Sequence, residues 1–119
     1  MAVRKQNSTY SLNEKFITEC DLTYAVHLLG GRWKLQLISE LKGQKLRFSD
    51  LHRLFSHITE RMLSLQLRAM EQDGLVKRTV YAEVPPRVEY ELTPQVLELL
   101  PVLDQLSDWG RRQREHKSE

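Results

Sequence analysis

The chain has 119 residues, of which 40% are hydrophobic and 29% are charged, and its formal net charge is +2. This length and composition are typical of a single globular domain with its own hydrophobic core, and they argue against a chain that is disordered throughout. No apolar run reaches the roughly 18–20 residues that a membrane-spanning helix requires, so we expect no membrane partner.

The N-terminal residues and the cysteine content indicate a cytoplasmic protein. Residues 1–16 lack the apolar stretch of a secretory signal peptide. Cys20 is the single cysteine of the sequence, so a disulfide within the chain is excluded, which is typical of the reducing cytosol. We therefore expect a cytoplasmic location.

The first third of the chain predicts a flexible arm followed by helices. Residues 1–19 are polar and show little apolar periodicity, so we expect a flexible N-terminal arm with at most a short helical turn. Asp21 is a suitable N-cap for a helix over residues 22–29, and Gly30 ends that helix. Apolar residues at helical spacing predict a further helix over residues 32–42.

Two more helices follow, joined by a turn of about three residues. The first covers about residues 48–55, with Ser49 as the candidate N-cap and apolar positions at Phe48, Leu51, Leu54 and Phe55. The second begins at Thr59 and ends at Gly74, and its apolar stripe consists of Met62, Leu63, Leu67 and Met70. A short turn between two such helices is typical of a helix-turn-helix pair.

The period of the hydrophobic pattern then changes to two. Residues 75–81 and residues 87–92 alternate between apolar and polar side chains, and the two prolines within residues 82–86 join them. We therefore expect a β-hairpin with a stiff tip. Thr93 and Pro94 follow as the N-cap and first residue of a final helix.

This order of elements predicts a mainly α fold with a small β-hairpin. A helix-turn-helix pair followed directly by a hairpin, or wing, is a winged helix-turn-helix, here with additional N- and C-terminal helices for dimerisation. We expect the DNA-binding and dimerisation domain to cover residues 20–113, between the flexible arm and a frayed tail over residues 114–119.

Four segments of the sequence resemble one known family. They are GGRWKLQLISEL, LRFSDL, ITERMLSLQLRAMEQDGLVKR and YAEVPPRVEYELT. All four resemble the HxlR-type family of bacterial winged helix-turn-helix transcriptional regulators, which are MarR-like, and the resemblance runs from about Cys20 to Trp109. It implies a homodimeric transcription factor that binds operator DNA, mainly as a repressor. The sequence departs from the family at Glu60, where a proline or small residue is common, and at Val96, where glycine is more frequent.

The positive charge is concentrated around the predicted helix-turn-helix. Residues 32–78 contain ten basic and five acidic residues, which gives +5, whereas residues 79–119 contain five basic and eight acidic residues, which gives −3. A basic region in a small domain favours a polyanionic partner such as double-stranded DNA. For a winged-helix homodimer, that partner is an operator with an inverted repeat.

The helix that begins at Thr59 is the predicted recognition helix. Because its apolar stripe faces the core, the opposite face is left for the major groove, and it carries Glu60, Arg61, Ser64, Leu65 and Arg68. Either arginine is a candidate to bind guanine, and Leu65 is a candidate to contact a thymine methyl group. The alternative for each side chain is an ordinary solvated surface.

Basic residues outside this helix are candidates for phosphate contacts, which fix the register of a protein on DNA. They are Arg47, Arg53, Lys77 and Arg78. Arg87 follows the two prolines of the hairpin, so its guanidinium is a candidate for the minor groove, where the negative potential is greatest. Alternatively, Arg87 pairs with Glu83 or Glu89 and never meets DNA.

The last helix carries more apolar residues than a small core needs. We expect the surplus to pack against a second copy of the chain. The stripe consists of Val96, Leu99, Leu100, Leu103, Leu106 and Trp109. The alternative is that this helix only closes the core of its own chain.

Cys20 is the candidate sensor residue. Some regulators of the HxlR-type family sense oxidants or electrophiles through an N-terminal cysteine, so the resemblance allows a redox role here. A helix N-terminus favours the thiolate, whereas the neighbouring Glu19 and Asp21 oppose it. The alternatives are a reduced, passive cysteine and a small-molecule effector that no residue of the sequence indicates.

The sequence indicates no enzyme, cofactor or metal site. It contains no Gly-rich phosphate loop and no nucleophile with an evident base, and its histidines lack the spacing of metal ligands. The remaining alternative is a winged helix that binds another protein and leaves DNA alone. The basic face of the helix that begins at Thr59 favours DNA.

Overall fold

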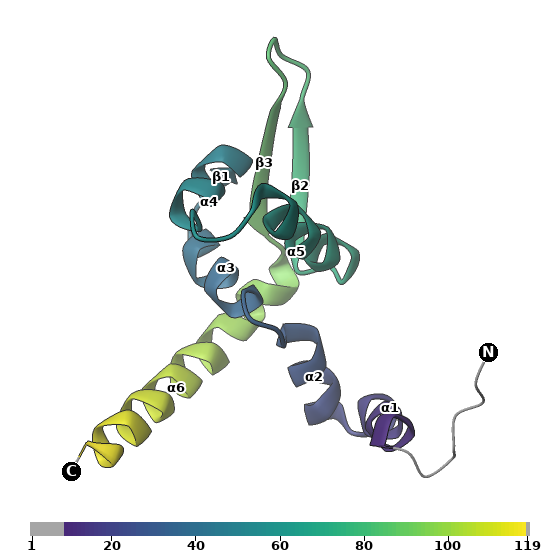
Figure 1. Cartoon of the computed structure of the whole chain (residues 1–119), viewed down its shortest axis with the longest axis vertical. Helices are drawn as coiled ribbons and strands as arrows, with labels where there is room; N and C mark the ends of the chain where they lie inside the picture. The colour runs from purple at the N-terminus through teal and green to yellow at the C-terminus, as the bar shows by residue number, and fades with distance from the viewer. Residues whose placement is uncertain (1–8, 119) are drawn as a thin grey trace. The chain divides into compact units, whose positions relative to one another are not determined.

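The computed structural model describes residues 9–118, with side chains from residue 14 onwards. Its elements follow in the order α1 (Thr9–Glu19), α2 (Asp21–Leu29), α3 (Lys34–Leu41), β1 (Leu46–Arg47), α4 (Phe48–Leu54), α5 (Glu60–Gln72), β2 (Val76–Tyr81), β3 (Arg87–Leu92) and α6 (Pro94–Lys117) (Figure 1). The expected mainly helical fold is confirmed, because the helix-turn-helix pair α4–α5 is followed directly by the β2–β3 wing. The chain divides into two units, Met1–Gln36 and Leu37–Glu119.

The first unit contains the packed helices α1 and α2. Residues 9–19 are helical, so the expectation of a flexible arm with one short turn is wrong for this stretch, and residues 1–8 lie outside the described part. The sequence gives little sign of α1, because contact with α2 supplies the stabilisation that its own hydrophobic pattern does not. Helix α2 begins at Asp21, one residue before the predicted start.

The core of the second unit lies where α3, α4, α5 and the sheet meet. Its fully buried side chains are Leu37, Ile38, Leu41, Leu51, Leu63, Leu67, Met70 and Val96. The three helices each contribute one apolar face at helical spacing, as the sequence predicts. Burying each large aliphatic side chain contributes about 1.5–3 kcal/mol relative to leaving it exposed, which holds the helix-turn-helix pair against the wing.

Helix α4 begins differently from the prediction. Ser49 is not its cap, because the helix starts at Phe48 and Arg47 occupies the N-cap position. The backbone N–H of Arg47 donates a 3.2 Å hydrogen bond to the Asp50 carboxylate, so an acidic side chain inside the first turn orders this end of the helix.

Two apolar residues of the helix-turn-helix pair lie outside the core. Leu54 of α4 and Met62 of α5 are exposed, whereas the sequence pattern groups them with buried neighbours. Leu51 and Leu63 occupy the buried faces instead. The two exposed side chains lie at the edges of those faces, where a pattern of apolar residues alone does not separate buried from exposed positions.

The sheet has three antiparallel strands in the order β1-β3-β2. The predicted hairpin is confirmed, since β2 and β3 pair along their full length. Strand β1 pairs Leu46 with Tyr90 and Arg47 with Glu89. A strand of two residues shows no alternation, so the sequence does not predict it, yet it ties the start of α4 to the central strand of the sheet.

Helix α6 starts directly after the wing. Pro94 is its first residue, as predicted, and Thr93 occupies the N-cap position. The Thr93 hydroxyl does not cap the helix, because Oγ1 donates a 2.6 Å hydrogen bond to the Gly74 carbonyl oxygen. This bond fastens the start of α6 to the start of the wing.

The far end of α6 also differs from the prediction. The helix continues to Lys117, so residues 114–117 are helical where the sequence predicts a frayed tail. An ion pair of 3.2 Å joins Arg111 to Glu115 one turn later and supports this part of the helix.

Candidate nucleic-acid interface

Helix α5 has one buried face and one exposed face. Thr59 is its N-cap, as predicted, and the hydroxyl oxygen accepts a 3.0 Å hydrogen bond from the Met62 backbone N–H. Leu63, Leu67 and Met70 are buried, which fixes how the helix is rotated about its axis. The side chains of the predicted recognition face are therefore all exposed: Glu60, Arg61, Ser64, Leu65 and Arg68.

The two arginines of this face are available to a partner. Within residues 14–118, no acidic side chain forms an ion pair with Arg61 or Arg68. They lie seven positions apart, which places them two turns apart on the same side of the helix. A helix face of this kind fits the major groove of B-DNA, where an arginine binds guanine through two hydrogen bonds.

His52 connects the two helices of the helix-turn-helix pair. Its Nε2 lies 3.2 Å from the carbonyl oxygen of Ile58, in the turn that leads to α5, and its Nδ1 lies 3.8 Å from the Glu60 carboxylate. Its ring also stacks on Phe48, with the ring centroids 6.4 Å apart. The sequence does not indicate this role, because His52 and Glu60 meet only through the fold of the turn.

The predicted phosphate contacts outside α5 are exposed cations. Arg53 Nη1 lies 3.6 Å from the Asp50 carboxylate, and Lys77 Nζ lies 4.0 Å from the Glu91 carboxylate. Such exposed pairs are weak, so a phosphate group can replace the acidic partner. The other two predicted contacts are exposed as well: Arg47 and Arg78.

Arg87 of β3 is held by its own hairpin. Its Nη2 lies 3.3 Å from the Glu83 carboxylate, and its Nε lies 3.3 Å from the Glu89 carboxylate. The guanidinium also covers the ring of Tyr81, its cross-strand neighbour, 4.1 Å from the ring centroid. The structure thus shows the pairing that the sequence left as the alternative to a minor-groove contact, and Tyr81 is a partner that the sequence did not indicate.

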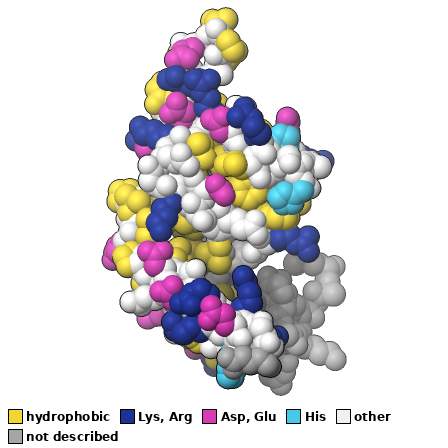
Figure 2. All heavy atoms as spheres, turned by 90° about the vertical axis from the view of Figure 1, so that its left-hand side faces the viewer, with side chains coloured by type: hydrophobic (Ala, Val, Ile, Leu, Met, Phe, Trp, Pro, Cys, Tyr) yellow, Lys and Arg dark blue, Asp and Glu magenta, His cyan; other side chains and the backbone are white. Residues whose placement is uncertain are grey.

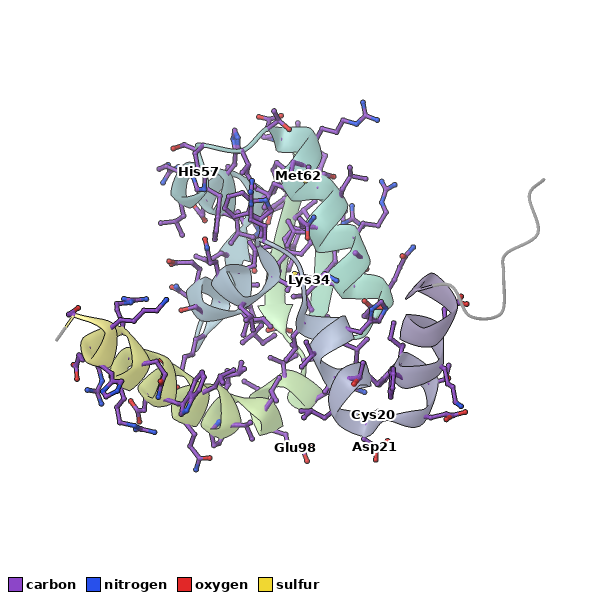
Figure 3. The ribbon with its side chains drawn as sticks, turned by 60° about the horizontal axis from the view of Figure 1, so that its bottom comes forward. Cys20, Asp21, Lys34, His57, Met62 and Glu98 are labelled. Carbon is purple, nitrogen blue, oxygen red and sulfur yellow. The ribbon has the colours of Figure 1, made fainter. Side chains whose placement is uncertain are left out.

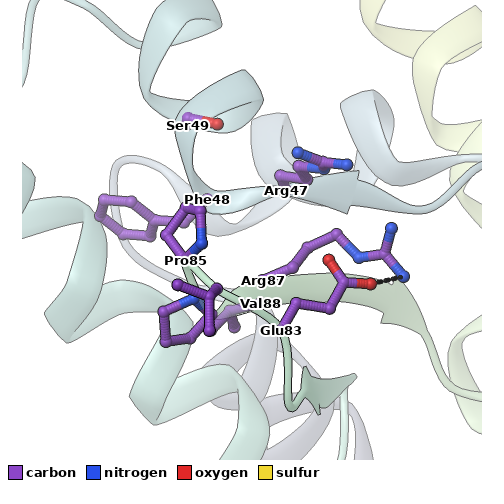
Figure 4. Close-up of a pocket in the computed structure, with 9 residues that line it drawn as sticks. Arg47, Phe48, Ser49, Glu83, Pro85, Arg87 and Val88 are labelled. Atoms are coloured by element: carbon purple, nitrogen blue, oxygen red, sulfur yellow. Dashed lines mark ion pairs between the residues drawn. The ribbon is translucent and has the colours of Figure 1, made fainter.

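A cleft of about 440 Å³ separates the start of α4 from the tip of the wing (Figure 4). It is lined by Arg47, Phe48 and Ser49 on one side and by residues 83–88 on the other. Residues 82–86 of the tip are exposed, so the tip gains little stabilisation from burial. Its order therefore depends mainly on contacts within the hairpin.

Comparison with known proteins identifies the family of the chain. Residues 28–118 match the HxlR-like helix-turn-helix family. The chain belongs to this family of transcriptional regulators. An HTH-type transcriptional regulator of Methanothermobacter thermautotrophicus is 46% identical over 98 residues, which are 82% of this chain and 75% of that protein. The HTH-type regulator YdeP of Bacillus subtilis is 39% identical over 115 residues, which are 97% of this chain and 88% of YdeP.

Solved structures agree with this assignment to the HxlR-like family. The reduced form of the redox regulator HypR is 42% identical with a TM-score of 0.73, and the match covers 78% of this chain and 92% of the HypR chain. The reduced form of the transcriptional regulator YodB of Bacillus subtilis is 32% identical with a TM-score of 0.69, over 76% of this chain and 89% of YodB. The resemblance of the sequence to this family is therefore confirmed, and the family implies DNA as the partner. Within residues 9–118, no helix is long and apolar enough to cross a membrane.

Cys20 of this HxlR-like regulator occupies the N-cap position of α2 and is partly exposed (Figure 3). The pKa of its thiol lies below the ordinary value because polar groups of Thr23 favour the thiolate, the side chain first and the backbone N–H second. The charge of Asp21 opposes this shift, as predicted, but the polar groups of Thr23 outweigh it. The contribution of the Thr23 hydroxyl was not apparent from the sequence.

Helix α6 leaves much of its apolar surface exposed. Of the residues predicted to contact a second copy, Val96 lies instead in the core of its own chain, because the first turn of α6 packs against the sheet. Leu106 and Trp109 are 52% and 54% exposed. Leu97 and Val102, which widen the predicted stripe, are exposed as well, and Leu99, Leu100 and Leu103 are partly exposed.

Proposed function

We propose that this HxlR-like regulator is a homodimeric repressor that binds an inverted-repeat operator, with α5 in the major groove and the β2–β3 wing beside it. The observation that carries the proposal is the exposed face of α5, where Arg61 and Arg68 lie two turns apart and no described acidic residue pairs with them. The buried leucines of α5 hold this face in one orientation.

Each side chain of the α5 face has a role that follows from its chemistry. Arg61 and Arg68 bind guanine, and Leu65 contacts a thymine methyl group. Ser64 donates to a base or a phosphate, while Glu60 accepts from a cytosine amino group or repels phosphates in a wrong register. Thr59 orders the helix end that enters the groove, through its hydrogen bond to the Met62 N–H.

The surrounding cations bind the phosphate backbone and set the position of α5 in the groove. They are Arg47, Arg53, Lys77 and Arg78. If a dimer neutralises about eight phosphates, the logarithm of the binding constant falls against the logarithm of the salt concentration with a slope of about −7.

Dimerisation follows from the exposed surface of α6. Large apolar side chains exposed along one helix favour association with a second copy. The residues assigned to the interface are Leu99, Leu100, Leu103, Leu106 and Trp109, while Val96 supports the helix from within the core. Two-fold symmetry then places two copies of α5 about one turn of DNA apart, roughly 34 Å or a multiple of it.

Control by oxidants is assigned to Cys20. The polar groups of Thr23 favour its thiolate, which is the reactive form of the side chain. The Cys20 thiol reacts with a second thiol, which is either Cys20 of another copy or a small-molecule thiol. Together the two thiols give up two electrons and two protons to an oxidant such as diamide and form one disulfide bond. The redox regulator HypR among the structural neighbours supports this assignment.

The experiment that tests the function is selection of bound duplexes from a random pool by the full chain. We expect the wild-type protein to enrich an inverted repeat and the double variant Arg61→Ala/Arg68→Ala to enrich none. Selection in the presence of diamide gives weaker enrichment for the wild-type protein, whereas Cys20→Ser is unaffected. A wild-type chain that retains no duplex contradicts the proposal and favours a winged helix that binds another protein.

A further inference from the structure

We propose that Arg87 is a positioning residue of the wing and not a ligand of DNA, and that the wing meets the minor groove through the apolar residues of its tip, Val84, Pro85 and Pro86. The proposal rests on the proposed DNA-binding function. It reverses the role that the sequence suggested for Arg87, because the structure shows what this side chain already binds.

Arg87 joins both sides of the hairpin. Glu83 lies in the turn, Glu89 lies further along β3, and Tyr81 belongs to β2, so the three contacts of the guanidinium connect the turn to both strands. The Arg87 side chain is 26% exposed and the Glu89 side chain 19%, so water screens this pair less than it screens an exposed pair. The buried Arg87 Nε makes no hydrogen bond with the described residues, so Glu89 is held by charge, while the face of the planar guanidinium covers the aromatic ring.

Moving Arg87 into the minor groove is unfavourable. The guanidinium would leave Glu83 and Glu89 without their cation, close to the phosphate backbone, and it would uncover the ring of Tyr81. With Arg87 in place, its guanidinium faces both carboxylates, and Arg47 is the residue of β1 paired with Glu89.

With Arg87 paired inside the hairpin, the side chains that the tip can offer to DNA are apolar. Val84, Pro85 and Pro86 are exposed, and Val84 is fully so. The hairpin extends beyond the helices of the second unit in Figure 1, and Figure 2 shows hydrophobic side chains at its very end. Apolar side chains pack against the walls and base steps of a minor groove without needing a charge.

The positioning role of Arg87 is tested first on the free protein, by measuring amide hydrogen exchange in the tip of the wing. The N–H of Glu83, which donates a 2.9 Å hydrogen bond to the Tyr81 carbonyl, is the main reporter. We expect Arg87→Ala and Glu89→Gln to speed its exchange several-fold, and Arg87→Lys to restore protection only in part. Lys77→Ala, at the other end of β2, is the matched control and leaves the tip unchanged. Exchange that is unaffected by Arg87→Ala overturns the positioning role, and no DNA is needed for this result.

The contact of the tip is tested on the duplex recovered by selection. We expect Val84→Ser to weaken binding by about fourfold for each methyl group that the groove buries. Val80→Ser, which alters another exposed valine of the same hairpin, is the matched control and leaves binding unchanged. Equal binding by Val84→Ser and the wild-type chain overturns the tip contact.

The salt dependence of binding separates the two roles of Arg87. If Arg87 is a positioning residue, Arg87→Ala/Glu89→Gln, which removes this ion pair without changing the net charge of the protein, weakens binding but leaves the salt slope unchanged. A guanidinium on DNA would instead lower the magnitude of the slope by about 0.9 for each protomer, and that result overturns the proposal. If the wild-type chain retains no duplex, the proposed function fails together with the tip contact, while hydrogen exchange still decides the positioning role.

Discussion

Arg61, Arg68 and Arg87 are the same residue type, but their surroundings give them different roles. Arg87 binds two carboxylates and an aromatic ring, whereas no described acidic residue pairs with Arg61 or Arg68. A cation without an internal partner loses no existing ion pair when it binds DNA. The two arginines of α5 are therefore the better candidates for base contacts.

Single substitutions on α5 should change specificity more than overall binding strength. We expect Arg61→Ala and Arg68→Ala each to cost about 1–3 kcal/mol at one base pair of each half-site and to relax the preference at that position. Lys77→Ala should weaken binding uniformly across sequences. Affinities for a set of singly substituted duplexes measure both effects, and a uniform loss for the α5 variants would argue that these arginines contact only phosphates.

The Thr23 side chain is the main cause of the lowered pKa of Cys20. A lowered pKa means that the thiolate is already present at a pH where an ordinary thiol is protonated, so alkylation should begin at lower pH. We expect Thr23→Ala to raise the pKa and to shift the rise of the alkylation rate to higher pH. Iodoacetamide rates measured against pH report the shift, and identical profiles would exclude Thr23 as the cause.

At the scale of elements, the ends of α5 decide where the recognition face lies. The Thr59 hydroxyl accepts from the Met62 N–H at one end, and Gly74 follows the other end with a φ of +74°. We expect Thr59→Ala to lower the free energy of unfolding by about 1 kcal/mol. Denaturant unfolding checks this, and Ser49→Ala, which removes a hydroxyl that does not cap α4, is the control with little effect.

Gly74 joins α5 to the wing in a conformation that other residues rarely adopt. A Cβ atom at this position would also come within 3.0 Å of the Gln95 side chain. We expect Gly74→Ala to destabilise the protein by about 1–2 kcal/mol because of the positive φ. The double variant Gly74→Ala/Gln95→Ala also removes the neighbouring side chain. If it is no more stable than Gly74→Ala alone, the backbone conformation and not crowding causes the destabilisation.

The elements also show how far the sequence predicts this structure. The periodicity of apolar residues predicts α5 and the hairpin because each buries one face. Thr59 predicts the start of α5 because a threonine N-cap can be recognised from the local sequence. Helix α1 and strand β1 were missed, since one depends on packing against α2 and the other has two residues. The contacts of His52 with Glu60 and of Arg87 with Tyr81 join residues that only the turn and the hairpin bring together, so no spacing rule shows them.

At the scale of the whole molecule, the proposed repressor requires two copies. Leu106 and Trp109 are exposed on α6 far from the core of the second unit, so replacing them should not unfold the chain. We expect Leu106→Glu to shift the protein from dimer to monomer in analytical ultracentrifugation and to weaken operator binding. Gln105→Glu, which adds the same charge at a neighbouring exposed position, is the control. A monomeric wild-type chain would contradict the symmetric assembly.

The central claim is that the exposed face of α5 reads DNA. Its most direct test is the affinity of the wild-type chain and of Arg61→Ala/Arg68→Ala for the recovered inverted repeat and for a scrambled duplex, at one fixed salt concentration. The account predicts that the wild-type chain prefers the repeat and that the double variant loses this preference while remaining folded and dimeric. An unchanged preference in the double variant would contradict it.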